Sequence, residues 1–231
     1  MDFDRINSGA MRFSVGTVNV RTGNFAYFDT TTDKIGPKHI LASSALPPGF
    51  PAIEIDGEMY WDGGLVSNTP LQWVVDSEPR CDTLAFQVDL WSSRGEFPKD
   101  LTEVAVRQKE IQYSSRTRAS TDRLKRMQEI RSALAKVLLT LPPEGRASAE
   151  GKMLSAFADL KVYNIVQLIY RSKHYEGNSK DYEFSRLSMA DHWSAGHADA
   201  LRALRHDEIF ERPDSIEGFR SFDFDEKDAK S

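Results

Sequence analysis

A short hairpin that leads into two adjacent glycines constrains the fold of this chain more than any other feature. Residues 53–55 and 59–61 are apolar-rich segments joined across Asp56-Gly57, and Asp-Gly is a strong signal for a two-residue hairpin turn. The second segment leads directly into Asp62, which Gly63 and Gly64 follow. Glycine permits positive φ and close approach of another backbone. The sequence therefore predicts a carboxylate that leaves the end of a strand and points at a neighbouring loop.

An earlier hairpin and a short helix are expected before this point. Residues 13–20 are rich in β-branched and apolar side chains, and the turn residues 21–24 should return the chain into a strand at 25–28. A helix that begins at Pro37 must end before Pro47-Pro48, because proline lacks the amide donor and clashes with the preceding turn.

Helix and strand continue to alternate after the glycines. The run Asn68-Thr69-Pro70 offers an N-cap and a first-turn proline for a helix that ends at Val75. Residues 83–90 form an apolar run bounded by polar residues, which is typical of a buried strand. The alternation of strand, helix and strand predicts an α/β fold.

Past about residue 98 the pattern becomes mostly helical. Two sets of residues recur at spacings of three and four, which places each set on one face of a helix. The first set is Met127, Ile130, Leu134, Val137, Leu138 and Leu141, and the second is Leu187, Ala190, Ser194, His197, Leu201 and Leu204. The first face is interpreted as core or, alternatively, as partner-binding, and its helix should end at Pro142-Pro143.

These patterns divide the chain into three parts. Residues 1–97 form an α/β part, and residues 98–213 form a mixed, mostly helical extension with one further strand at 162–170. The extension either packs onto the sheet or stands alone. Residues 214–231 form an acidic tail that is expected to be irregular and partly disordered.

Composition limits the partners and the compartment. The chain has 231 residues, of which 40% are hydrophobic, and a net charge of −5, which gives no overall attraction to nucleic acid. The single cysteine, Cys81, excludes an internal disulfide framework and is expected to be a small buried hydrophobe. No export signal or apolar segment of about 20 residues is visible. We therefore expect a cytoplasmic protein, peripheral to a membrane at most.

One local charge asymmetry bears on membrane contact. The stretch 107–136 contains nine basic and three acidic residues. Its simplest interpretation is the solvated side of a helix. The alternative hypothesis is a transient contact with anionic lipid headgroups or with substrate phosphate.

The region around Asp62 resembles a known enzyme family. The run Met59-Tyr60-Trp61-Asp62-Gly63-Gly64-Leu65-Val66-Ser67-Asn68-Thr69-Pro70, preceded by Ala42-Ser43-Ser44-Ala45-Leu46-Pro47-Pro48-Gly49-Phe50-Pro51, resembles the second half of the patatin-like phospholipase active site. The resemblance implies a partial patatin-like α/β hydrolase sheet with flanking helices, of which residues 1–97 are the C-terminal part.

The same resemblance implies roles for individual residues. Asp62 is the catalytic base, and Gly63 and Gly64 allow it to approach the pocket. Ser43 and Ser44 help to build the pocket near the base, with helix end and turn as the simpler interpretation. Asn68 either braces the Asp62 loop or serves only as an N-cap.

The implied chemistry is a Ser-Asp dyad that acts on acyl esters of lipids, in which the Asp accepts the proton of a nucleophilic serine. A nucleophile elbow needs glycines two positions on either side of the serine, and no G-x-S-x-G occurs in these residues. The nucleophile and its oxyanion loop are therefore expected upstream of this chain. The alternative is a non-catalytic truncated homologue that acts as a lipid-binding or interaction protein.

The remaining motifs suggest neither a metal nor a cofactor. His192 and His197 are five residues apart, whereas four would place two ligands on one helix face, so His197 is interpreted as a hydrogen-bonded core residue. Trp61, Trp73, Trp91 and Trp193 lie in hydrophobic segments and are expected in the core. No oligomeric state is predicted.

The extension carries a resemblance of its own. Residues 107–116 and the segment around Ala190-Asp191-His192-Trp193 resemble the C-terminal region that follows the patatin domain in a bacterial subgroup. This resemblance implies no chemistry for the extension.

Overall fold

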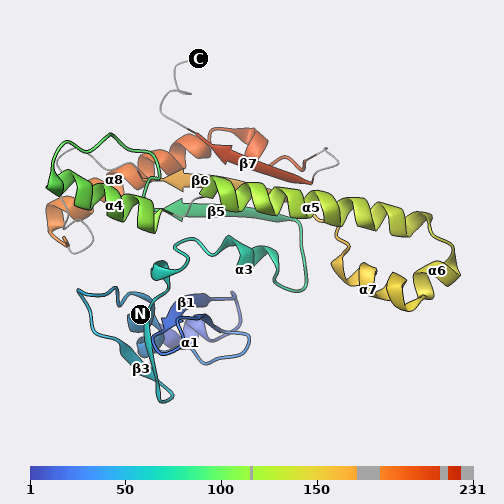
Figure 1. The fold of residues 1–231 in the computed structure, drawn as a ribbon, viewed down its shortest axis with the longest axis horizontal. Helices are drawn as coiled ribbons and strands as arrows, with labels where there is room; N and C mark the ends of the chain where they lie inside the picture. Colours follow the sequence, from blue (N-terminus) through green and yellow to red (C-terminus); the bar gives the residue numbers. More distant parts are fainter. Residues whose placement is uncertain (115–116, 171–182, 214–217, 225–231) are drawn as a thin grey trace. The chain divides into compact units, whose positions relative to one another are not determined.

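The computed structural model of the chain describes residues 1–114, 117–170, 183–213 and 218–224 (Figure 1). Its contacts divide it into two units, Met1–Pro70 and Leu71–Ser231. This division falls earlier in the chain than the boundary near residue 98 suggested by composition, and that boundary stays a prediction.

The first unit is built on a four-stranded antiparallel sheet in the order β2-β1-β4-β3. Both predicted hairpins and the helix at Pro37 are confirmed, whereas the first helix was not anticipated. The elements are α1 (Phe3–Ile6), β1 (Ser14–Asn19), β2 (Phe25–Asp29), α2 (Pro37–Ser43), β3 (Ile53–Ile55), β4 (Glu58–Asp62) and the 3₁₀ turn η1 (Gly63–Leu65).

Local turn chemistry positions the strand that carries Asp62. In the β3–β4 turn, Asp56 and Gly57 both have positive φ, at 50° and 82°. This is the backbone that an Asp-Gly hairpin turn requires, and it fixes the register of the two strands. β4 also pairs with β1, so that Asp62 lies opposite Thr17.

A buried carboxylate anchors the other end of this sheet. Asp29 is 2% exposed and accepts hydrogen bonds from the Ser14 hydroxyl, from the Thr31 hydroxyl at 2.6 Å and from Arg12 Nε at 2.8 Å. Burial raises the pKa of this carboxyl, but the hydrogen bonds from Ser14, Thr31 and Arg12 outweigh burial and hold the pKa below its ordinary range. Asp29 is therefore a charged structural group.

The second unit contains a three-stranded parallel sheet in the order β5-β6-β7, which confirms the α/β class. The predicted strands at 83–90 and 162–170 are both present. The elements are α3 (Leu71–Val75), β5 (Thr83–Asp89), α4 (Leu101–Tyr113), α5 (Thr117–Thr140), α6 (Pro143–Ala147), α7 (Ala149–Phe157), β6 (Tyr163–Ile169), α8 (Arg186–Ala203), the 3₁₀ turn η2 (Asp207–Ile209) and β7 (Phe219–Asp223). Because β6 pairs with β5, the extension joins the sheet.

Helices cover both faces of the central strand β6. On one face, Tyr163 and Ile165 pack with Leu124 of α5 and with α3. On the other face, Val166 packs with Ala203 of α8 and with η2. Parallel sheets are normally buried on both faces, and β6 follows this rule.

The last strand corrects the expectation for the acidic tail. Residues Phe219–Asp223, expected to be irregular, form β7 against β6. Phe219 is 2% exposed and shares a core cluster with Tyr163. Since this pairing joins residues far apart in the chain, local composition does not reveal it. Residues 214–217 and 225–231 of the predicted tail lie outside the described residues.

Half of the predicted apolar face of α5 is exposed, which corrects its interpretation as core. Leu138 is buried at 6% exposure, but Ile130 and Val137 are 62% and 56% exposed. The face that packs inward instead carries Thr121, Leu124, Gln128, Ser132, Ala135 and Leu138. Small and polar residues thus cover this side of the sheet.

Other burial predictions also fail in the second unit. The residues of α8 that contact the rest of the unit are not the predicted face, and His197 is exposed, so its interpretation as a core residue is wrong. Trp193 is 76% exposed. Cys81 is exposed as well, and its thiol lies 3.4 Å from the carbonyl oxygen of Pro79.

The strand β5 is buried on one face only. Leu84, Phe86 and Val88 alternate along it and are 38%, 44% and 57% exposed. They point to the same side of the sheet as Val166 and Leu168, because each lies beside an even-numbered residue of β6. The helix α8 covers that side over β6, and the prediction of a fully buried strand is therefore wrong for β5.

Candidate active site

Asp62 lies where the sequence predicts it, at the last position of β4. Its backbone N–H donates a hydrogen bond to the carbonyl oxygen of Ala45 at 3.1 Å, and its pairing with Thr17 fixes the strand end. The loop that follows the Ser43-Ser44 pair is therefore tied to the backbone of Asp62. The antiparallel sheet and the end of α2 together determine where the carboxylate starts.

The turn η1 orients the carboxylate. Asp62 Oδ1 accepts a hydrogen bond from the backbone N–H of Gly64 at 2.7 Å, as the capping residue of this turn. Among the residues that the structure describes, this is the one hydrogen bond to the carboxylate. Burial raises the pKa of Asp62 above its ordinary value, and the bond from Gly64 offsets part of the rise.

Gly63 is required by close packing and not by its backbone angle. A Cβ atom at Gly63 would lie 2.6 Å from the carbonyl oxygen of Gly16 in β1 and 3.0 Å from the ring of Phe25. Neither Gly63 nor Gly64 has positive φ, so that part of the sequence argument is wrong, whereas the argument from close approach is right. The tight contact brings η1 against the strand that also pairs with Asp62.

Asn68 faces the same turn. Its Oδ1 would lie 3.4 Å from a Cβ at Gly64, and Asp62 Oδ1 would lie 3.1 Å from the same atom. The two side-chain oxygens therefore flank one glycine. The following helix α3 begins at Leu71, three residues further on, so the N-cap interpretation of Asn68 is wrong. The role of Asn68 as a brace stays a prediction.

The two predicted pocket serines differ in their surroundings. The Ser44 hydroxyl donates to the carbonyl oxygens of Ile40 and Leu41, at 3.0 and 3.2 Å, and caps the end of α2. Ser43 is half-buried in the last turn of α2. Within the described residues, no serine hydroxyl donates to the Asp62 carboxylate.

Sequence reasoning missed three residues that contact the backbone of Asp62 or Gly63, which are Gly16, Phe25 and Ala45. A lone glycine inside a strand often marks a close backbone approach, so Gly16 carried a readable signal. The carbonyl of Ala45 carried none, because any residue there could supply it.

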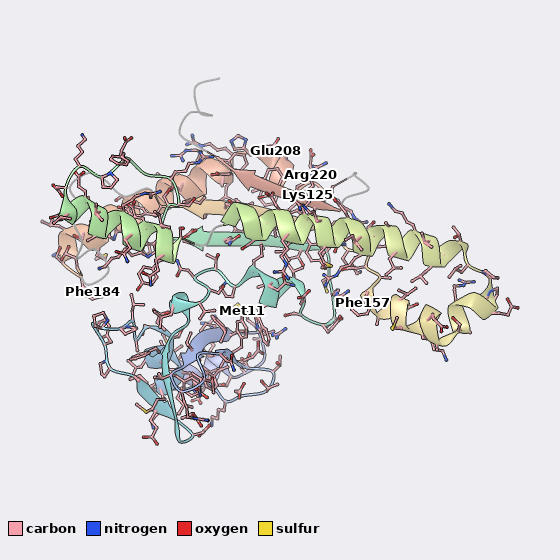
Figure 2. The ribbon with its side chains drawn as sticks, in the orientation of Figure 1. Met11, Lys125, Phe157, Phe184, Glu208 and Arg220 are labelled. Atoms are coloured by element: carbon pink, nitrogen blue, oxygen red, sulfur yellow. The ribbon has the colours of Figure 1, made fainter. Side chains whose placement is uncertain are left out.

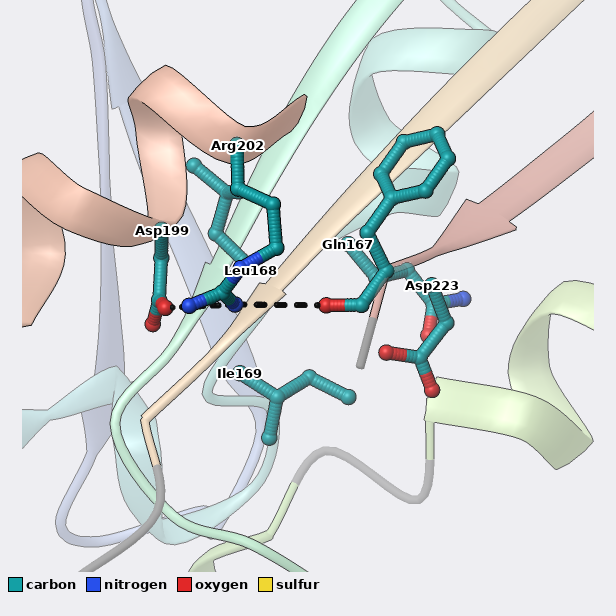
Figure 3. A pocket seen from close by; sticks show the side chains of 7 residues that line it. Gln167, Leu168, Ile169, Asp199, Arg202 and Asp223 are labelled. Carbon is teal, nitrogen blue, oxygen red and sulfur yellow. Dashed lines mark hydrogen bonds and ion pairs between the residues drawn. The ribbon is translucent and has the colours of Figure 1, made fainter. Parts of the chain in front are cut away.

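A small hollow lies in the second unit, at the carboxyl end of β6 (Figure 3). It is polar: Arg202 Nη1 contacts Asp199 at 3.0 Å and the carbonyl oxygen of Phe224 at 3.5 Å, and Asp223 lies on the other side. Its free volume of about 10 Å³ holds roughly one water molecule. It is therefore too small for an acyl substrate.

Comparison with known protein families assigns the chain. One family model, described as patatin-like phospholipase, matches residues 2–74 and so covers the whole site around Asp62. A second, described as patatin phospholipase, matches residues 111–216. The chain belongs to the patatin-like phospholipase family. No curated protein matches it.

For this patatin-like protein, the family implies the substrate class, which is lipid acyl esters. The second match covers α5 through η2, so the extension is itself a recognised part of patatin phospholipases. This agrees with its resemblance to the C-terminal region of a patatin subgroup.

Proposed function

We propose that this chain carries the general base of a serine lipid acyl hydrolase, and that the base is Asp62. The observation that supports this most directly is the fixed, half-buried carboxylate whose Oδ1 is held by Gly64 N–H at 2.7 Å. In this proposal, its second oxygen takes the proton of the nucleophilic serine. The raised pKa makes Asp62 a stronger base than a solvated aspartate.

In the proposed reaction, a serine hydroxyl attacks the carbonyl carbon of a lipid ester while its proton moves to Asp62 Oδ2. The alcohol leaves with that proton, and an acyl-serine remains. Water then attacks the acyl-serine in the same way, releasing the fatty acid and regenerating the serine. Gly64 holds the carboxylate through both steps, and Asn68 keeps the Gly64 turn in place.

The nucleophile in this proposal lies outside the present 231 residues, together with the oxyanion-hole donors. The sequence supports this because no serine in it has the G-x-S-x-G setting. Ser43 and Ser44 act as pocket residues here, and the cytoplasm, at a membrane surface, is the proposed place of action.

The decisive test is Asp62→Asn in the protein that carries both this chain and the serine. We expect turnover of a nitrophenyl ester to fall by about 10²- to 10⁴-fold, the usual contribution of a general base. Asp56→Asn is the matched control, since it removes a carboxylate at the other end of β4 and asparagine tolerates positive φ. Full activity of Asp62→Asn, with an unchanged melting temperature, would refute the assignment.

A fluorophosphonate probe on the isolated chain tests the placement of the nucleophile. We expect neither labelling nor ester hydrolysis. Labelling that disappears in Asp62→Asn would show that a serine within this chain works with Asp62, which would overturn the external nucleophile and retain the base.

The second candidate function is non-catalytic lipid binding. The exposed apolar residues of α5 and β5 favour it. An in-frame G-x-S-x-G in the coding sequence before Met1 would support the enzyme, and its absence would support the binding protein.

A further inference from the structure

One face of the helix α5 exposes apolar and basic side chains to solvent. Arg123, Arg126, Met127, Ile130 and Val137 recur at three, four and seven residues, so they share one face of the helix. All five side chains are exposed, with Ile130 at 62% and Val137 at 56%. We call these five residues the α5 stripe.

The stripe lies on the side of α5 that faces away from its buried residues, and α5 is also longer than the sheet on which it packs. Its 24 residues extend about 36 Å, whereas the seven residues of β5 or β6 extend about 23 Å. Figure 1 shows α5 continuing past the strands to α6 and α7. The opposite side of α5 packs inward, through the buried residues Thr121, Leu124, Gln128, Ser132 and Ala135.

The neighbouring helix α7 adds further exposed apolar side chains. It packs against α5, and Met153 and Phe157 are each 60% exposed. Figure 2 labels Phe157 at the end of α7. An exposed apolar surface of this kind usually marks an interaction site.

Charge indicates which partner fits. Helices α5 to α7 contain eight basic and four acidic residues. Arg131 is engaged by Asp76 at 2.8 Å, but Arg123 and Arg126 project from the stripe itself. Cations beside exposed Met, Ile and Val side chains on one helix face suit the headgroup and acyl boundary of an anionic membrane.

We propose that the α5 stripe, assisted by α7, docks this protein on an anionic lipid surface. The arginines meet lipid phosphates while Met127, Ile130 and Val137 enter the acyl boundary. None of the described helices is long and apolar enough to span a membrane, so the contact is peripheral. The proposal extends the lipid-hydrolase function but uses none of its catalytic residues.

Sedimentation with vesicles tests the docking surface. We expect the chain to bind vesicles that contain phosphatidylglycerol, more weakly at high salt, and not to bind pure phosphatidylcholine vesicles. The double variants Arg123→Gln/Arg126→Gln and Ile130→Gln/Val137→Gln should each weaken binding by about tenfold or more. The matched controls Lys34→Gln/Lys38→Gln and Leu187→Gln/Leu204→Gln, all exposed, should bind as the natural chain does.

A second measurement keeps the proposal falsifiable if a double variant fails to fold. In a Cys81→Ser background, an environment-sensitive dye on Val137→Cys should shift to the blue on anionic vesicles. No vesicle binding, or binding that both stripe variants retain, would overturn the proposal. A dimer that Ile130→Gln/Val137→Gln converts to monomer, without any effect on vesicles, would instead assign the stripe to a second copy of the chain.

These experiments test the proposed catalytic base and the proposed docking surface separately. Asp62→Asn should bind vesicles like the natural chain, because Asp62 is not part of the stripe. If Asp62→Asn keeps its turnover while the stripe variants lose binding, the proposed base is wrong and the docking surface stands.

Discussion

The sequence patterns predict the two units of this chain with different success. In Met1–Pro70, the predicted hairpins form, and the predicted catalytic carboxylate lies at the expected strand end. In Leu71–Ser231, the predicted strands and helices also form, but β7 was expected to be irregular, and residues expected in the core, such as Ile130, Phe86 and His197, are exposed. The difference shows that a pattern can define an element without defining what covers it.

The physical reason lies in how each sheet is connected. Antiparallel strands joined by a two-residue turn carry their own register, because the turn residues fix it. Parallel strands pair through long crossovers, and the helices in those crossovers choose their packing face from the whole unit. In α5, the inward face includes Gln128, which is 1% exposed and donates to the carbonyl oxygen of Lys161 at 2.8 Å.

The largest expected effect separates two neighbours on α5. Leu138→Ala should destabilise the chain by about 2–5 kcal/mol, because it leaves a cavity beneath the helix. Val137→Ala should change the free energy of unfolding by less than about 0.5 kcal/mol, since Val137 is 56% exposed. Urea denaturation of both variants measures the difference. Equal losses would mean that a partner covers Val137 in solution.

A comparable contrast exists at the two glycines of the candidate site. Gly63→Ala should cost about 1–3 kcal/mol, because its methyl group would meet the Gly16 carbonyl oxygen at 2.6 Å. Gly64→Ala has nothing nearer than Asp62 Oδ1 at 3.1 Å, so it should cost less stability and act mainly on the carboxylate. Thermal unfolding and ester turnover, measured on both variants, separate packing from chemistry.

Structural features that depend on residues close in the chain can be predicted from the sequence, whereas features that depend on distant segments cannot. The Asp-Gly turn, the prolines after α2 and the position of Asp62 depend on residues close in the chain, and each is right. The strand β7, the exposed face of β5 and the carbonyl of Ala45 depend on distant segments, and each was missed. A sequence motif identifies the candidate site, whereas the packing that holds the site in place is seen only in the structure.

Acid should unfold the first unit through Asp29. The folded pKa of Asp29 lies below its unfolded value, so its contribution to stability is present above the unfolded pKa of about 4 and is lost progressively as the pH falls from there through the lower folded pKa. Asp29→Asn should cost about 1–3 kcal/mol at neutral pH and flatten this acid limb. Unfolding curves between neutral pH and about pH 3 measure both effects. An unchanged acid limb in the variant would assign it to other carboxylates.

The smallest expected effect on stability is at Val88 in β5, where the same substitution should have a large effect on self-association. Val88→Lys replaces a side chain that is 57% exposed on the uncovered face, so the free energy of unfolding should change by less than about 0.5 kcal/mol. Ala85, three residues earlier, packs against the core formed with α3 and α5, so Ala85→Lys should destabilise the unit. An exposed apolar row on an edge strand favours self-association, because it resembles half of an interface. Sedimentation velocity should therefore show concentration-dependent assembly of the isolated chain that Val88→Lys reduces. Assembly that persists unchanged in Val88→Lys would remove β5 as its cause and leave the stripe on α5 as the next surface to test.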